Sequence, residues 1–176
     1  MNSILIPLIG GFVGVPIIVW LFWWITRESA GTPRMKEIAG YIQEGAYAFL
    51  KREVSTIFYV IIPFAIVFFF ILGWEIAFGF FLGALFSIIA IITGMSGAVI
   101  ANVRTANAAR TSPGRALVLA FRGGAIMGFS VVSLILLGIC SLYILFGVGP
   151  SNPEAVHMLV GFGLGASLSA MFAQIG

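Results

Sequence analysis

The sequence predicts an all-α fold, a polytopic transmembrane helical bundle of about five spans with its N-terminus outside. Three observations point to this fold. Hydrophobic residues make up 61% of the 176-residue chain and charged residues only 9%, whereas soluble domains hold roughly 45–50% and about 25%. Apolar runs recur along the chain, and the basic residues fall in two short blocks between them. A bilayer hides this much apolar surface, and its lack of water requires each spanning segment to be helical.

Five apolar runs are about as long as the ~20 residues that cross the hydrocarbon core of a membrane. They cover residues 4–25, 57–74, 77–101, 116–146 and 155–175. Three tryptophans, Trp20, Trp23 and Trp24, cluster at the end of the first run, as expected of an aromatic belt at a membrane interface. Trp74 and Glu75 mark the opposite interface.

The positions of the basic residues predict the orientation of the spans. The first block lies between the first two runs, and the second lies around the third connection. The two blocks contain Arg27, Arg34, Lys36, Lys51 and Arg52, then Arg104, Arg110, Arg115 and Arg122. Both blocks fall on one side of a membrane, and the positive-inside rule makes that side cytoplasmic. The net charge of +3 is therefore interpreted as a topology signal and as anionic-lipid contact, and no nucleic-acid partner is expected.

The connection at residues 32–53 is predicted to be an amphipathic helix at the cytoplasmic surface that continues toward the second span. Its apolar residues recur at helical spacing and form one stripe. Thr32 is a suitable N-cap, and Pro33 suits the first helical position. Two interpretations stay open. The helix packs on the bundle or the interface only, or its polar face also helps to cover a cytoplasmic active site.

Glycines recur at four-residue spacing inside the predicted spans. The pairs are Gly10 and Gly14, Gly79 and Gly83, Gly124 and Gly128, and Gly161 and Gly165. Small residues at this spacing let helix backbones approach closely in lipid. We expect these pairs to pack the bundle, and a dimer interface built on one of them is the alternative.

The second basic block offers candidate contacts to phosphate. Residues 102–115 form a polar extension of the third span, and Arg104 and Arg110 are its candidates for phosphate oxygens or for the wall of a cytoplasmic site. A topology signal explains these arginines equally well. Arg122, a further candidate for phosphate or for the cytoplasmic wall, lies deeper, inside the fourth span. Its side chain is expected either to reach back to the interface or to pair with a carboxylate in the bundle.

No catalytic or metal site can be assembled from this sequence. The chain contains no aspartate, and its six glutamates lie outside the predicted spans. The single histidine, His157, is expected to be a solvated loop residue. A hydrolytic metal site needs converging carboxylates or imidazoles, so we assign no catalytic and no metal-binding residue. The last apolar run ends at Gly176 without a charged anchor, which predicts that the native polypeptide continues.

Four segments together resemble one known family. They are residues 31–53 (GTPRMKEIAGYIQEGAYAFLKRE), 94–110 (GMSGAVIANVRTANAAR), 120–128 (AFRGGAIMG) and 161–167 (GFGLGAS). In this order they resemble the N-terminal portion of membrane-bound, ion-translocating inorganic pyrophosphatases, which pump protons or sodium ions. The similarity covers nearly the whole chain but only about the first quarter of the family's length.

The resemblance implies a function that the residues alone do not. Family members are homodimers that hydrolyse magnesium pyrophosphate at the cytoplasmic ends of inner helices and move protons or sodium ions outward. The first four spans would belong to an outer ring of helices and the fifth to the inner ring. The ligands of Mg²⁺ and substrate would follow Gly176, as would the positions that decide potassium dependence, which is left unknown. Gln174 lies where many members carry an arginine beside the ion-coupling region, so a hydrogen-bonding role remains for it.

Two functions of different classes follow. The first is part of a pyrophosphate-driven pump, an integral multi-pass membrane protein whose 176-residue portion is inactive by itself because it lacks the carboxylates. The alternative is a small non-catalytic membrane scaffold or channel subunit. That alternative needs a polar pathway through the bundle, for which the sequence offers only serines, one threonine and Gln174.

Overall fold

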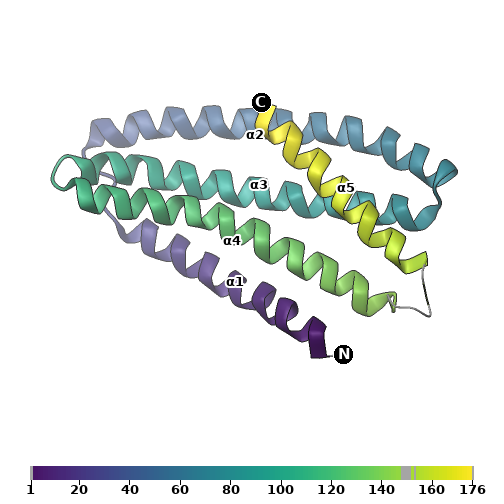
Figure 1. The fold of residues 1–176 in the computed structure, drawn as a ribbon. Coiled ribbons are helices and arrows are strands. Elements are labelled where there is room, and N and C mark those ends of the chain that lie inside the picture. Colours follow the sequence, from purple (N-terminus) through teal and green to yellow (C-terminus); the bar gives the residue numbers. More distant parts are fainter. Residues whose placement is uncertain (1, 148–151, 153, 176) are drawn as a thin grey trace.

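The computed structural model describes residues 2–147, 152 and 154–175, and these residues form five long α-helices (Figure 1). The helices are α1 (Asn2–Arg27), α2 (Pro33–Ile71), α3 (Trp74–Ala109), α4 (Pro113–Leu145) and α5 (Glu154–Ile175). Each of the five is long and apolar enough to cross a membrane. The all-α transmembrane architecture that the sequence predicts is thus confirmed.

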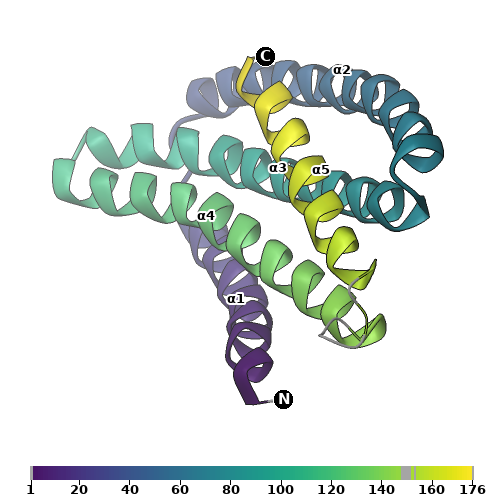
Figure 2. The ribbon, with the colours of Figure 1, turned by 45° about the vertical axis from the view of Figure 1, so that its right-hand side comes forward.

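Helix α3 lies at the centre of the bundle and contacts all four other helices. α4 packs along one side of α3, and α2 packs along another. α1 packs chiefly against α4, so it lies at the edge of the bundle, and α5 crosses α3 obliquely (Figures 1 and 2). The ends of α1 and α3 and the beginnings of α2 and α4 gather at one end, which we call the basic end. It comprises residues 27–36 and 104–115.

Helix α2 joins two segments that the sequence analysis treated separately. The amphipathic stretch expected at residues 32–53 and the second apolar run form one continuous helix of 39 residues. That length corresponds to almost 60 Å at about 1.5 Å per residue, roughly twice the hydrocarbon thickness of a bilayer. The helix is therefore longer than the apolar layer of a bilayer is thick.

Polar caps begin α2 and α4. The Thr32 hydroxyl accepts a hydrogen bond from the backbone N–H of Met35 (3.3 Å), and Pro33 opens the helix, as predicted. Ser112 caps α4 in the same way, accepting from the N–H of Arg115 (3.4 Å). Such caps satisfy backbone donors that have no partner inside the helix. Because Ser112 and Pro113 form a cap, α4 begins three residues before the apolar run expected at 116–146.

The turn between α2 and α3 differs from the expected boundary. The second span was expected to reach Trp74, but α2 ends at Ile71 and Trp74 opens α3. Gly73 lies between them with a φ of 100°, a left-handed conformation that side-chain-bearing residues disfavour. Gly73 therefore fixes the break, and Trp74 belongs to the third helix.

Glycines from two of the predicted pairs form the crossing of α3 and α5. A methyl group added at Gly79 or Gly83 would overlap the backbone carbonyls of Met158 and Phe162, respectively. Conversely, methyl groups added at Gly161 and Gly165 on α5 would overlap the backbone carbonyls of Ile76 and Phe80 on α3, respectively. The two backbones are thus in direct contact, as small residues at four-residue spacing permit. By contrast, Gly124 and Gly128 have open space beside them.

The buried core lies between the helices, while large apolar side chains cover the outside. Ile57, Ile61, Phe80, Ala84, Ile88 and Ile91 form one buried cluster between α2 and α3. On the outer surface, Tyr59 and Phe70 are each 80% exposed. Soluble proteins rarely expose continuous apolar surface of this kind. The exposed apolar faces are therefore suited to contact with lipid.

Candidate functional site

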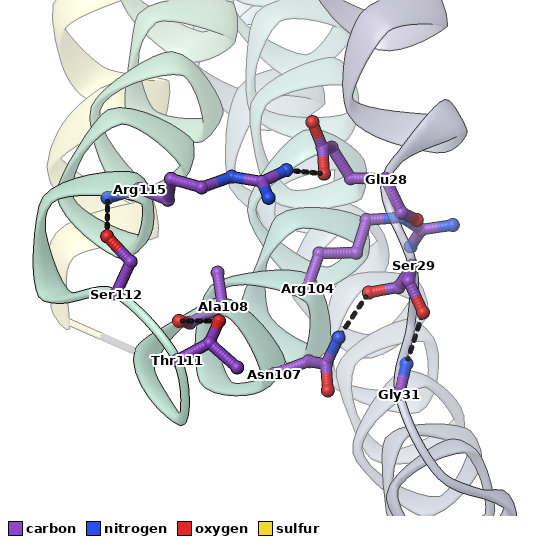
Figure 3. Close-up of polar contacts among 9 residues, drawn as sticks. All are labelled: Glu28, Ser29, Gly31, Arg104, Asn107, Ala108, Thr111, Ser112 and Arg115. Atoms are coloured by element: carbon purple, nitrogen blue, oxygen red, sulfur yellow. Dashed lines mark hydrogen bonds and ion pairs between the residues drawn. The ribbon is translucent and has the colours of Figure 1, made fainter.

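The polar side chains of the basic end hold the connection between α1 and α2 against α3 and α4 (Figure 3). Arg104, half-buried near the end of α3, donates from Nε to the carbonyl of Glu28 (3.1 Å). Its Nη1 donates to the carbonyl of Ile100 (2.8 Å) one turn earlier in α3. Asn107 donates from Nδ2 to the carbonyl of Ser29 (3.2 Å). Two side chains of α3 thus satisfy consecutive backbone carbonyls after the end of α1.

Glu28 joins the same connection to α4. Its carboxylate accepts a hydrogen bond from Nη2 of Arg115 (3.0 Å), and the Arg115 side chain is the more exposed of the two. The carbonyl of Glu28 contacts α3 while its carboxylate contacts α4 (Figure 3). Glu28 therefore joins three helices, and its contacts hold the ends of α1 and α3 beside the beginning of α4.

Gly31 allows the chain to turn tightly into α2. Its φ is 81°, and a Cβ at this position would lie 2.7 Å from both the Asn107 Oδ1 and the Met35 Sδ. Glycine is favoured here for two reasons, the left-handed backbone and the lack of space for a side chain. The turn places Thr32 where it caps α2.

The predicted phosphate candidates lie in different surroundings. Arg104 is directed toward backbone carbonyls. Arg110 is exposed in the turn after α3, with its Nη1 3.8 Å from the Met35 Sδ. Arg122 lies between α4 and α1, with its Cζ 3.7 Å from the ring centroid of Trp24 and 5.6 Å from that of Trp20. The three guanidinium groups have no neighbour in common among these contacts.

The structure bears on one of the two expectations for Arg122, the pairing with a carboxylate. Among the described residues no carboxylate forms a salt bridge with it, and the two salt bridges there are Arg34–Glu37 and Arg115–Glu28. Its Nη1 is buried and has no hydrogen-bond partner in the described part of the chain. Its planar guanidinium stacks on the Trp24 ring instead, a favourable cation–π arrangement.

The residues that the structure describes do not form a metal site. No group of three or more His, Cys, Asp or Glu side chains there could hold a metal ion. His157 is exposed, as predicted, but it lies in the first turn of helix α5 and not in a loop. Gln174, the candidate for ion coupling, belongs to the last turn of α5, and its side chain lies outside the described residues. What this part of the molecule provides is a rigid basic end and a framework of helices.

Sequence reasoning missed the contacts of Glu28, Ser29 and Asn107 that hold the basic end together. Their polarity was visible, but the contacts join residues 76 to 87 positions apart. No local pattern predicts pairing over such distances. The stacking of Arg122 on Trp24 was missed for the same reason, although both residues had been placed near one membrane interface.

The sequence of the chain is similar to those of known membrane pumps. A sequence model of the family described as "Inorganic H+ pyrophosphatase" matches residues 12–176. A K(+)-insensitive pyrophosphate-energized proton pump of Methanosarcina mazei is 46% identical over 86% of this chain. A putative K(+)-stimulated pyrophosphate-energized sodium pump of Clostridium tetani is 46% identical over 99% of it. A K(+)-stimulated pyrophosphate-energized sodium pump of Thermotoga maritima is 38% identical over 86%.

The chain spans about a quarter of the length of these relatives. The matched regions make up 22%, 25% and 23% of the Methanosarcina, Clostridium and Thermotoga proteins, respectively.

Proposed function

The chain belongs to the inorganic H+ pyrophosphatase family, and we propose that it is part of a membrane pump. In this proposal the pump couples hydrolysis of inorganic pyrophosphate to outward movement of protons or sodium ions. The observation that carries the proposal is the 46% identity to a pyrophosphate-energized pump over 99% of the chain. Relatives of both ion types and of both potassium responses are similar to the chain.

The role proposed for this part of the pump is structural support at the side where the substrate binds. Its described residues supply no set of metal ligands, so magnesium and the catalytic carboxylates are assigned to other parts of the native protein. The basic end supplies positive charge on Arg110, which is exposed and forms no salt bridge among the described residues. Positive charge at the mouth of a site favours an anionic substrate such as pyrophosphate.

We place the basic end in the cytoplasm and the beginning of α1 outside. The support is the gathering of arginines and lysines at one end of the bundle, since short cytoplasmic loops carry an excess of these residues. Thiol labelling tests the orientation in a variant that lacks Cys140. A cysteine replacing Thr111 is expected to react with a membrane-impermeant maleimide only after permeabilisation. A cysteine replacing Glu75 is expected to react in intact cells. The reverse pattern would overturn the orientation.

Hydrolysis tests the proposed activity. The native protein that contains this chain is expected to release phosphate from pyrophosphate when Mg²⁺ is present and to stop when the metal is chelated. The isolated 176-residue chain is expected to release none, because its described residues cannot form a metal site. Phosphate release by the isolated chain would contradict the assignment of the catalytic groups elsewhere.

We also propose a homodimer, which chemical cross-linking of the native protein in membranes would detect as a species of twice the subunit mass.

A further inference from the structure

Two arginines and three tryptophans form a cluster at the edge of the bundle, where α1 ends beside α4. We call it the Arg–Trp cluster, and it comprises Trp20, Trp23, Trp24, Arg27 and Arg122. The Cζ of Arg27 lies 3.6 Å from the ring centroid of Trp23. The Cζ of Arg122 lies 3.7 Å from that of Trp24 and 5.6 Å from that of Trp20. The tryptophans hold two positive charges at the level of their rings.

The positive charge of the cluster lacks a counter-ion among the described residues. Both salt bridges found there use other arginines, Arg34 and Arg115. The Nη1 of Arg122 is buried and donates to no acceptor in the described part of the chain. A guanidinium group carries five N–H donors, and a buried donor that stays unpaired is costly. Arg122 as a whole is only half-buried, so an anionic oxygen acceptor would reach the N–H groups of its guanidinium that stay accessible.

A shallow, open apolar groove on the outer face of α1, lined by residues of this helix alone, adjoins the cluster. It has a volume of 530 Å³ and is lined by Val15, Pro16, Val19, Trp20 and Trp23. Val19 is 63% exposed, and Trp20 and Trp23 are about half exposed. The opposite face of α1 is the packed one, since Leu21 and Ile25 are buried. The groove is therefore on the side of α1 that faces away from the bundle.

Tryptophan prefers the depth of a bilayer where lipid headgroups meet acyl chains, so the three tryptophans near the end of α1 indicate that the cluster lies at this depth. Trp24 lies within the last turn of α1, which ends at Arg27. A phosphate at this depth would meet the guanidinium groups, and an acyl chain would extend along the groove. Trp23 and Trp24 each already have a guanidinium group over the ring. The positively charged choline group of a zwitterionic lipid would therefore meet like charge there.

We propose that the Arg–Trp cluster binds one anionic phospholipid. Its phosphate accepts hydrogen bonds from Arg122 and Arg27, and one acyl chain occupies the groove of Val15, Pro16 and Val19. Charge complementarity selects an anionic headgroup over a zwitterionic one. Bidentate pairing of arginine with phosphate supplies the directional part of the recognition. The bound lipid anchors α1, the helix at the edge of the bundle, at one membrane interface.

Native mass spectrometry of the native protein that contains this chain tests the proposal. Delipidated protein in detergent is titrated with dioleoylphosphatidylglycerol or with dioleoylphosphatidylcholine. We expect phosphatidylglycerol to fill one site that phosphatidylcholine fills poorly. Arg122→Gln is expected to weaken that site about tenfold, the effect of losing about 1.4 kcal/mol from a charged hydrogen bond. Arg34→Gln, which removes an exposed arginine at the same end of the molecule, is the matched control and is expected to leave the site unchanged.

Each other outcome overturns the proposal. Equal binding of the two lipids would mean that the site does not recognise charge. Unchanged phosphatidylglycerol binding in Arg122→Gln would mean that Arg122 has another partner, such as a segment of the same polypeptide. Displacement of the lipid by 10 mM inorganic phosphate would show a site for a free anion. If Arg122→Gln does not fold, Arg27→Gln takes its place, because Arg27 is exposed. This variant is expected to bind phosphatidylglycerol more weakly.

Discussion

Alanine in place of Gly165 should loosen the crossing of α3 and α5. The added methyl carbon would lie 2.7 Å from the carbonyl carbon of Phe80 and 3.0 Å from the backbone nitrogen of Ala84, and it would overlap the Phe80 oxygen. Carbon atoms pack best at about 3.5–4.0 Å. Because the obstructing atoms are backbone, no side-chain rotation relieves the overlap, and the two helices must move apart by roughly 1 Å.

The magnitude follows from a comparison with Gly163, which lies in the same helix and has nothing within 4 Å of an added methyl. Both substitutions gain the helix propensity of alanine over glycine, about 1 kcal/mol in either case. The gain therefore cancels when the two variants are compared. What remains is the cost of overpacking, about 1–3 kcal/mol, so Gly165→Ala should be less stable than Gly163→Ala by that amount.

Thermal unfolding of the 176-residue chain in detergent, followed by circular dichroism, measures the difference. The expected order of melting temperature is Gly163→Ala at or above the unchanged chain, then Gly165→Ala several degrees lower. Equal melting temperatures for the two variants would refute the backbone contact between α3 and α5. Gly83→Ala, on the facing helix, should repeat the loss, since its methyl would meet the carbonyl of Phe162.

The basic end yields three further predictions, each measured by thermal unfolding. Arg104→Gln should lower the free energy of unfolding by about 1.5–3 kcal/mol, because a charged donor to two backbone carbonyls is lost. An equal loss in Arg34→Gln, which removes one partner of an exposed ion pair, would contradict this. Thr32→Ala removes the cap of α2 and should lower the free energy of unfolding by about 1 kcal/mol. An unchanged free energy of unfolding would mean that the cap is dispensable. Glu28→Gln removes the ion pair with Arg115 and should lower the free energy of unfolding by less than about 1 kcal/mol. Salt screens such a pair, so no loss is expected in 1 M salt. A loss that does not depend on salt would contradict this explanation.

The sequence predicted the helices well because the physical signals for them are local. Apolar length alone identified the five spans, since helices are the expected solution for spanning segments. The cap at Thr32 and Pro33 was also predictable, because it depends on neighbouring residues only. The end of α2 was predicted wrongly by three residues, since hydropathy does not detect the turn that Gly73 makes with its positive φ.

The pairing of helices was beyond the sequence. Four-residue glycine spacing predicted close approach, but not that Gly79 and Gly83 meet the helix of Gly161 and Gly165. The same spacing at Gly124 and Gly128 faces open space, so the pattern does not identify its partner. Arg122 illustrates the same limit. Its place within the fourth helix was predictable, while its position over the ring of a tryptophan 98 positions earlier depends on how α1 and α4 pack.

Pyrophosphate-driven ion transport tests the central proposal most directly. The native protein that contains this chain is reconstituted into sealed vesicles, and magnesium pyrophosphate is added outside while vesicle pH and internal sodium are followed. We expect a proton or sodium gradient that forms only with pyrophosphate and only in vesicles whose basic end faces the added substrate. Ion flux that needs no pyrophosphate, or hydrolysis without any gradient, would contradict the account.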